Sequence, residues 1–78
     1  MKTPVYVREL TEEEWERLKT GLRSQDRFEI RRSQIVLASA RKETARRIAR
    51  TLSCDDQTVR NVIQKFNAIG LGVLKAGS

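Results

Sequence analysis

The sequence predicts an all-α fold of about four helices, and three observations favour it. Apolar residues recur at helical spacing along most of the 78 residues. Two segments open with residue pairs that cap helices, and β-favouring residues are confined to one short patch near the N-terminus. In the second half, a polar gap separates two short apolar periods, and two helices joined by a tight turn would explain that gap.

The N-terminal ten residues are expected to form an extended arm that leads into the first helix. Val5, Tyr6 and Val7 favour β structure but are too few to build a sheet, so we expect them to pack on the helices. Thr11 and Glu14 have the spacing of a capping box, which predicts that the helix begins there. We expect the core face of this helix to hold Trp15, Leu18 and Leu22. We expect the helix to end near Gly21.

A second helix is predicted from Asp26 to about Arg41. Asp26 and Glu29 repeat the capping-box spacing. The later part of the segment is apolar on nearly every side, which is expected when neighbours cover several faces. Arg31 and Arg32 interrupt the apolar pattern, so we place them at the surface, with contact to DNA phosphate as the open alternative.

The third helix is predicted to start after Thr44, whose hydroxyl can cap its N-terminus. With Ile48 at about 0° on a helical wheel, Ala45, Ala49 and Leu52 fall within roughly 100° of it. The other surface holds three arginines, which suit phosphate oxygens because a guanidinium presents a planar fork of donors. These arginines are Arg46, Arg47 and Arg50.

A tight turn follows at Ser53 and Cys54, with Asp55 as the expected N-cap of the fourth helix. A serine at position 53 carries a modest steric cost if its φ is positive, because glycine suits that conformation better. Asp56 has three interpretations: it helps to start the helix, it repels a DNA phosphate, or it accepts from a cytosine amine. Cys54 is interpreted as a small buried side chain.

The fourth helix is predicted to have one apolar and one polar face. With Val59 at about 0° on the wheel, Val62, Ile63 and Phe66 fall near roughly 300°, 40° and 340°. The outward residues lie at about 100° to 200°, and they are Gln57, Arg60, Asn61 and Gln64. Asn and Gln pair with adenine and Arg with guanine in the major groove, so we predict that these four read bases. An ordinary amphipathic helix with a polar outside is the open alternative.

A second set of residues is predicted to hold DNA phosphates. The first helix of a helix-turn-helix crosses the DNA backbone while the second enters the groove. Arginine and lysine supply charge there, and threonine hydroxyls supply further contacts. The set consists of Thr44, Arg46, Arg47, Arg50, Thr58 and Lys65.

Composition favours a polyanionic partner and argues against catalysis. Residues 41–78 hold eight Lys and Arg against three Asp and Glu, whereas residues 1–40 hold eight against seven, and this asymmetry favours a polyanionic partner. The basic face is poor in aromatic residues, which argues against a membrane surface, so we expect double-stranded DNA. The sequence has no histidine, so we expect no enzyme activity, catalytic residue, metal, cofactor or small-molecule substrate. It has one cysteine, so we expect no internal disulfide. Because no apolar signal or spanning segment is present, we expect a cytoplasmic protein.

The expected organisation is an extended arm over residues 1–10, a helical domain over residues 11–70, and a tail or truncated linker over residues 71–78. Gly70 is expected to stop the last helix. The apolar residues that follow it either fold back on the core or lead toward further chain.

Several short motifs occur together along nearly the whole chain. They are Leu10 to Glu14, Arg31 to Ala38, Ile48 to Arg50, Thr58 to Arg60, Phe66, and Gly70-Leu71 followed by Leu74. This combination resembles the N-terminal DNA-binding region of insertion-sequence transposases in the bacterial branch of the mariner superfamily. The resemblance implies binding to terminal inverted repeats through the fourth helix, with the catalytic acids in a metal-dependent domain further along the chain. The sequence departs from that family at Ser53, Cys54 and the Asp55-Asp56 pair.

We therefore predict an all-α, homeodomain-like or paired-like domain that binds duplex DNA by sequence. It would be the end-recognition domain of a transposase or a truncated derivative, and specificity could require a homodimer. Two alternatives stay open. One is a standalone transcriptional regulator, and the other is a protein-interaction module in which the apolar tail docks on a partner.

Overall fold

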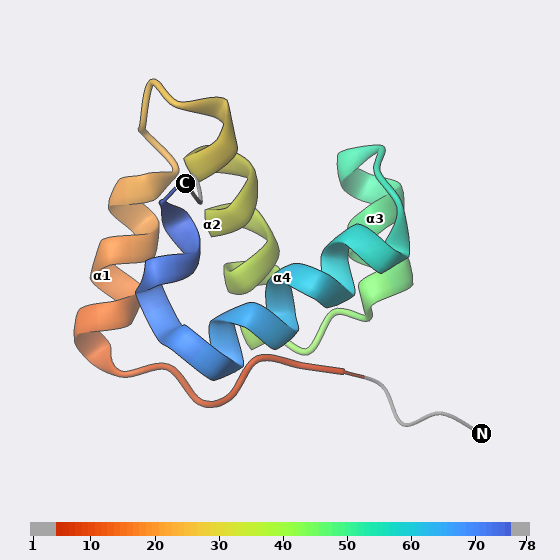
Figure 1. Ribbon diagram of the computed structural model, residues 1–78, viewed down its shortest axis with the longest axis horizontal. Helices are drawn as coiled ribbons and strands as arrows, with labels where there is room; N and C mark the ends of the chain where they lie inside the picture. The colour runs from red at the N-terminus through yellow and green to blue at the C-terminus, as the bar shows by residue number, and fades with distance from the viewer. Residues whose placement is uncertain (1–4, 76–78) are drawn as a thin grey trace.

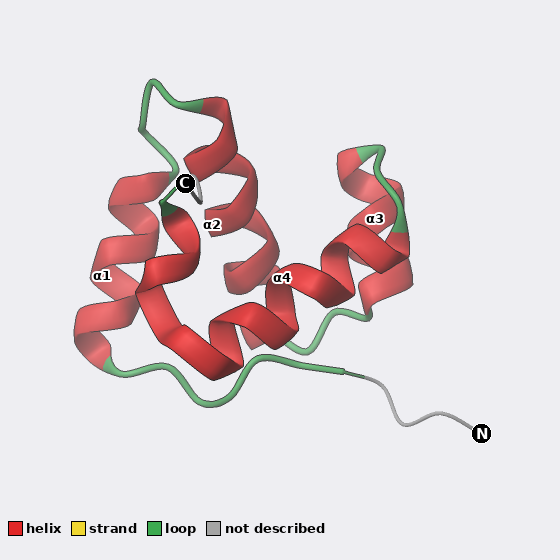
Figure 2. Cartoon of the chain, in the orientation of Figure 1, coloured by secondary structure: helices red, strands yellow, loops and turns green. Residues whose placement is uncertain are grey.

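The computed structural model describes residues 5–75, and every regular element in them is helical (Figure 1, Figure 2). The elements are α1 (Glu12–Gly21), α2 (Arg27–Ala40), α3 (Ala45–Leu52), α4 (Asp56–Ile69) and a 3₁₀ helix, η1 (Gly70–Leu74). α1 and α2 pack side by side at one end of the molecule, α3 lies at the other end, and α4 runs between them (Figure 1). The all-α prediction is confirmed.

The core forms where α4 meets the other helices. The predicted apolar face of α4 is confirmed, since Val59, Val62, Ile63 and Phe66 are all buried. Phe66 is the largest fully buried side chain. The other large side chains that are at most 1% exposed are Leu18, Ile35, Ile48, Ile63, Val36, Val59 and Val73. One core therefore joins all five helical elements and fixes the direction in which α4 presents its polar face.

Both predicted helix starts are observed, but the second uses a different bond. At α1, Thr11 Oγ1 accepts from the Glu14 amide while Glu14 accepts from the Thr11 amide, so the capping box is confirmed. At α2, Asp26 accepts from the Phe28 amide at 2.9 Å. The expectation that Glu29 completes a capping box there is wrong. Its carboxylate instead pairs with Arg17 of α1 at 2.7 Å, and the Asp26 amide donates to Ser24 Oγ at 3.0 Å.

Two other surface assignments need correction. Leu22 is 38% exposed rather than core-facing, because α1 ends at Gly21 and the chain turns before Leu22 can continue the apolar stripe. Arg32 is half-buried rather than fully at the surface. Its guanidinium lies 4.1 Å from the centre of the Phe28 ring and donates to the Val73 carbonyl at 3.4 Å. Desolvation lowers the pKa of Arg32.

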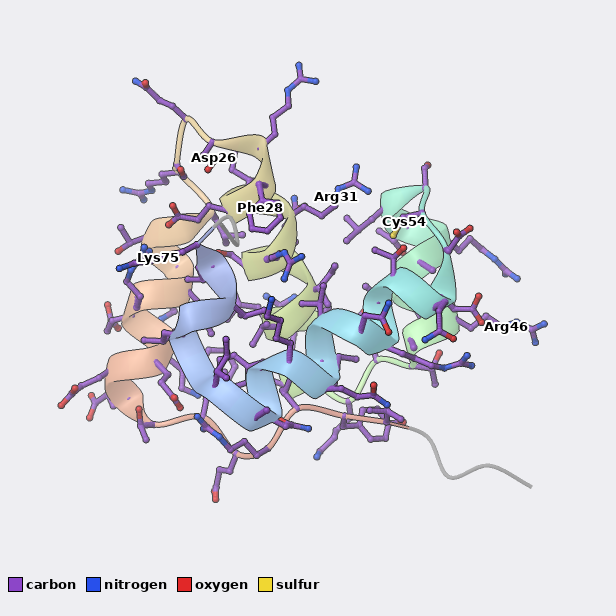
Figure 3. All side chains as sticks on the ribbon, viewed as in Figure 1. Asp26, Phe28, Arg31, Arg46, Cys54 and Lys75 are labelled. Carbon is purple, nitrogen blue, oxygen red and sulfur yellow. The ribbon has the colours of Figure 1, made fainter. Side chains whose placement is uncertain are left out.

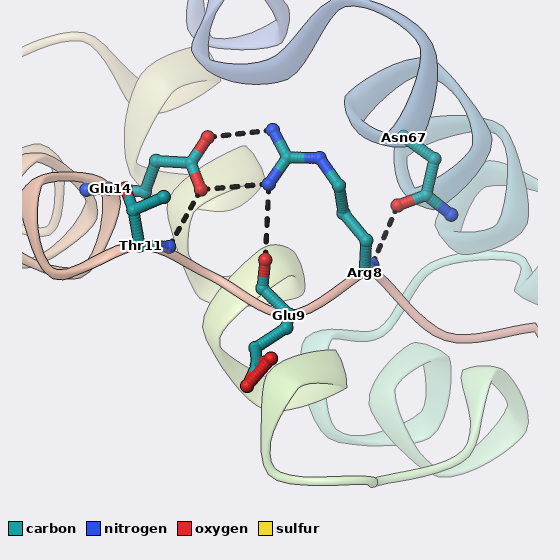
Figure 4. Close-up of polar contacts among 5 residues, drawn as sticks. All are labelled: Arg8, Glu9, Thr11, Glu14 and Asn67. Carbon is teal, nitrogen blue, oxygen red and sulfur yellow. Dashed lines mark hydrogen bonds and ion pairs between the residues drawn. The ribbon is translucent and has the colours of Figure 1, made fainter.

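The extended segment before α1 is hydrogen-bonded to the C-terminal part of α4 (Figure 4). The Arg8 amide donates to Asn67 Oδ1 at 2.8 Å, and Asn67 Nδ2 donates to the Tyr6 carbonyl at 3.1 Å. The Arg8 guanidinium donates to both carboxylate oxygens of Glu14 at 2.8 and 2.7 Å. Val7 is buried, as expected for an arm that packs on the helices. Residues 1–4 of the predicted arm lie outside the described residues.

We predict that the Arg8–Glu14 contact makes stability depend on acid. Hydrogen bonds from the Arg8 guanidinium, and after them the bond from the Thr11 amide, lower the pKa of Glu14 from its ordinary 4.5 to about 2. Because the folded pKa lies below the unfolded one, this stabilisation is complete above about pH 4.5 and is lost as the pH falls toward about 2. Glu14→Gln should therefore lower the free energy of unfolding at neutral pH, and the deficit should shrink through that window. Urea titrations of both proteins at several pH values would test this, and a deficit independent of pH would contradict it.

α1 and α2 pack closely at Gly21. A Cβ atom there would overlap the hydroxyl of Ser33 and lie 3.2 Å from the Ser33 Cβ. Ser33 is fully buried, and its Oγ has no hydrogen-bond partner among residues 5–75. Because Gly21 has no side chain, there is room for the Ser33 hydroxyl between α1 and α2, although this hydroxyl forms no hydrogen bond within residues 5–75.

We predict opposite effects for substitutions at these two positions. Gly21→Ala should destabilise by about 1 to 3 kcal/mol through overpacking. Ser33→Ala should be neutral or stabilising, because it removes an unsatisfied buried group. The double variant should recover part of the Gly21→Ala loss, as measured by urea unfolding. Strict additivity of the two single effects would count against direct contact.

The chain after α4 folds back on the core. Gly70 ends α4 with a positive φ of 67°, which glycine adopts without steric cost. In η1, Val73 and Leu74 are 0% and 3% exposed, and η1 packs on α4 and α2. The apolar side chains at the end of η1 are thus already buried within this chain. Residues 76–78 of the predicted tail lie outside the described residues.

Candidate nucleic-acid interface

α3 and α4 form the predicted helix-turn-helix. Ser53 ends α3 in the left-handed region with φ 58° and ψ 48°, so the predicted positive φ is observed. The Cys54 amide donates to the Ala49 carbonyl at 2.9 Å, which closes the turn. Cys54 is half-buried and packs against the core. A non-glycine residue therefore adopts the left-handed conformation in the turn between the two helices.

The two helices of the motif begin differently. Thr44 Oγ1 accepts from the Arg47 amide at 3.1 Å, so the predicted cap of α3 is confirmed. Asp55 occupies the N-cap position of α4, but its side chain makes no capping hydrogen bond, and that part of the prediction is wrong. Asp55 is exposed, so its carboxylate can accept hydrogen bonds from water instead of from the backbone amides of α4.

The four predicted base-reading residues lie on the accessible side of α4. Gln57, Asn61 and Gln64 are exposed, and the side chain of Arg60 is 40% exposed. Gln57 Nε2 donates to Asn61 Oδ1 at 3.0 Å. Because a carbonyl oxygen accepts two hydrogen bonds, this contact leaves Asn61 able to accept one more and to donate two. The face carries amide and guanidinium groups, and the core lies on the opposite side of the helix.

Asp56 contacts this face in a way that none of its three interpretations included. Its Oδ2 lies 3.4 Å from Arg60 Nη2, one helical turn away. The spacing of an acid four residues before an arginine is a signal for such a pair that the sequence does contain. Arg60 therefore has a carboxylate neighbour on its own helix before any partner binds.

The predicted phosphate contacts fall into two groups. Thr44, Arg46, Arg47 and Arg50 are exposed and, together with Thr51, line a shallow depression on α3. Arg46 projects away from the body of the molecule (Figure 3). Thr58 and Lys65 are also exposed, but they share one flank of α4, at about 260° and 240° on the wheel. The structure therefore brings the α3 residues together and leaves the α4 residues as a separate group.

Within residues 5–75, no three His, Cys, Asp or Glu side chains are grouped so that they could hold a metal ion. Over the same residues, none of the helices combines the length and the apolar character needed to cross a membrane.

Comparison with known proteins identifies the family. A family model for a homeodomain-like domain matches residues 26–75, which run from α2 through η1 and make up more than half of the chain. No curated protein matches the chain, and no solved structure does. The matched region contains the helix-turn-helix and the helix that packs behind it, whereas the arm and α1 lie outside the match. The chain therefore belongs to the homeodomain-like family of helix-turn-helix domains.

Proposed function

We propose that this chain binds duplex DNA by sequence, with α4 in the major groove, and that it catalyses no reaction. The observation that carries the proposal is the division of α4 into two faces. Val59, Ile63 and Phe66 are 0% exposed, while the opposite side presents Gln57 and Asn61 to solvent. Side chains of these types read base edges, and a helix of this size fits the groove.

The charge of the chain supports the same proposal. Its formal net charge is +6, and the α3 arginines form an exposed basic surface immediately before the reading helix. Arginine at such a position would hold backbone phosphates and orient α4.

We further propose that the chain is the end-recognition domain of a transposase, or a truncated derivative of one. The support is the resemblance of motifs such as Arg31 to Ala38 and Gly70-Leu71 to the insertion-sequence transposases described above. A protein-interaction role for the tail is disfavoured, because Val73 and Leu74 are buried within the chain.

Selection from a random duplex library, followed by anisotropy titration of the enriched sequences, tests the proposal. We expect a short enriched motif and salt-dependent binding. If the transposase assignment holds, the motif should occur in inverted orientation at two sites that flank the coding sequence. Equal binding to every duplex, or none, would overturn sequence-specific recognition. An enriched motif without the inverted pair would overturn only the transposase assignment.

Arg60 provides a prediction for base reading. Arg60→Ala should weaken binding to the preferred sequence by about 1 to 3 kcal/mol and relax the preference at one base pair. Arg60→Lys is the matched control, because it keeps the charge but loses the bidentate fork. It should keep the salt dependence while losing the preference. Repeating the selection with each variant would test this, and an unchanged motif with Arg60→Ala would contradict it.

A further inference from the structure

A second basic surface lies beside α4, and its arginines, all on α2, belong to neither the predicted base-reading set nor the predicted phosphate set. It is a concave region of about 310 Å³ between the two helices, and we call it the α2 cleft. Its lining residues are Arg27, Phe28, Arg31, Arg32, Ile35, Thr58 and Val62. Three of the seven are arginines, and one, Thr58, is a predicted phosphate contact on α4.

The arginines of the α2 cleft differ in their availability. Arg32 is held by Phe28 and by the Val73 carbonyl. Arg27 and Arg31 are exposed and form no ion pair within residues 5–75. Arg31 points from α2 toward the turn that carries Cys54 (Figure 3).

The carboxylates nearest to these arginines along α2 are already engaged. Asp26 caps the helix by accepting from the Phe28 amide, and Glu29 pairs with Arg17. The cleft is thus lined by two arginines that form no ion pair within residues 5–75, and by Thr58.

The α2 cleft adjoins one flank of α4, the helix that carries the predicted base-reading residues. Thr58 and Lys65 lie on one flank of α4, whereas Asn67, at about 80° on the wheel, lies on the opposite flank and is hydrogen-bonded to the arm. A helix about 10 to 12 Å wide nearly fills a major groove about 12 Å wide, so a phosphate backbone runs past each flank. The strand that passes the Thr58 flank would meet the α2 cleft.

We propose that the α2 cleft binds backbone phosphates of the duplex, with Arg31 and Thr58 as direct contacts and Arg27 beside them. This inference rests on the proposed DNA binding and adds a contact from α2, the helix behind the motif. Its chemistry matches phosphate, since two arginines that form no ion pair within residues 5–75 and one threonine line the same depression.

Salt titration of Arg31→Gln tests the proposal. Each lost phosphate contact lowers the slope of log affinity against log salt by about 0.9, so the loss of affinity should shrink about three- to fourfold between about 50 and 200 mM salt. Arg23→Gln is the matched control, because it removes the same charge from an exposed residue in the loop between α1 and α2. Thr58→Val should weaken binding about two- to tenfold with little change in slope.

Methylphosphonate substitution, which neutralises one phosphate at a time, identifies the contact. We expect at least one position where neutralisation weakens wild-type binding but not that of Arg31→Gln, and this position should differ from the one found in the same way with Arg46→Gln. If Arg31→Gln matches Arg23→Gln in slope and keeps every wild-type phosphate sensitivity, the α2 cleft is not a phosphate site, although DNA binding stands. If the wild-type protein shows no salt-dependent duplex binding, both proposals fail.

Discussion

Phe66→Ala is expected to bring the domain close to complete unfolding. Phe66 is fully buried in α4, and the Arg8 guanidinium lies 4.8 Å from the centre of its ring. Removing a buried phenylalanine side chain costs about 3 to 5 kcal/mol, and domains are stable by only about 5 to 15 kcal/mol, the low end being expected for 78 residues. The truncation also removes the surface on which Arg8 is seated, so the arm should loosen as well.

Urea unfolding followed by far-ultraviolet circular dichroism would measure the effect. Ile69→Ala is the matched control, because Ile69 lies on the same helix, three residues further on, and is 55% exposed. Its effect should stay within about 0.5 kcal/mol. Comparable losses for the two variants would mean that Phe66 does not sit at the centre of the core.

Periodicity and N-cap residues predicted the helices because both are local signals. The Thr11 and Thr44 caps and the buried face of α4 follow from local rules that act within a few residues. Glu29 and Arg32 were misassigned for the opposite reason. Their partners are Arg17 on another helix and Val73 far along the chain, and a local pattern carries no information about contacts between distant segments.

The candidate site likewise combines features set by local sequence with a feature that depends on contact between distant segments. The outward direction of Gln57, Asn61 and Gln64 follows from the helical wheel, because the core fixes the opposite side. The Asp56–Arg60 pair was within reach of the sequence through its spacing. The α2 cleft was not, since it forms only when α2 packs against α4 and brings Arg31 to Thr58.

The α3 arginines give the second large expected effect. Replacing Arg46 and Arg50 together with glutamine should lower the slope of log affinity against log salt by about 1.8, since each phosphate contact contributes about 0.9. Both side chains are exposed on the same depression and form no ion pair within residues 5–75. Their loss should therefore remove DNA contacts without removing contacts that hold the fold.

The matched control is a double substitution of Lys19 and Arg23 with glutamine, which removes the same net charge from exposed residues on α1 and the loop after it. Anisotropy titrations at several salt concentrations would separate the two double variants. A local contact predicts a reduced slope only for the α3 variant, because exposed charges more than a Debye length away, about 8 to 10 Å, are largely screened. The α3 variant should weaken binding to every duplex and keep the base preference, since phosphates carry no direct sequence information. Equal slopes for the two variants would assign the affinity to net charge alone and would remove α3 from the interface.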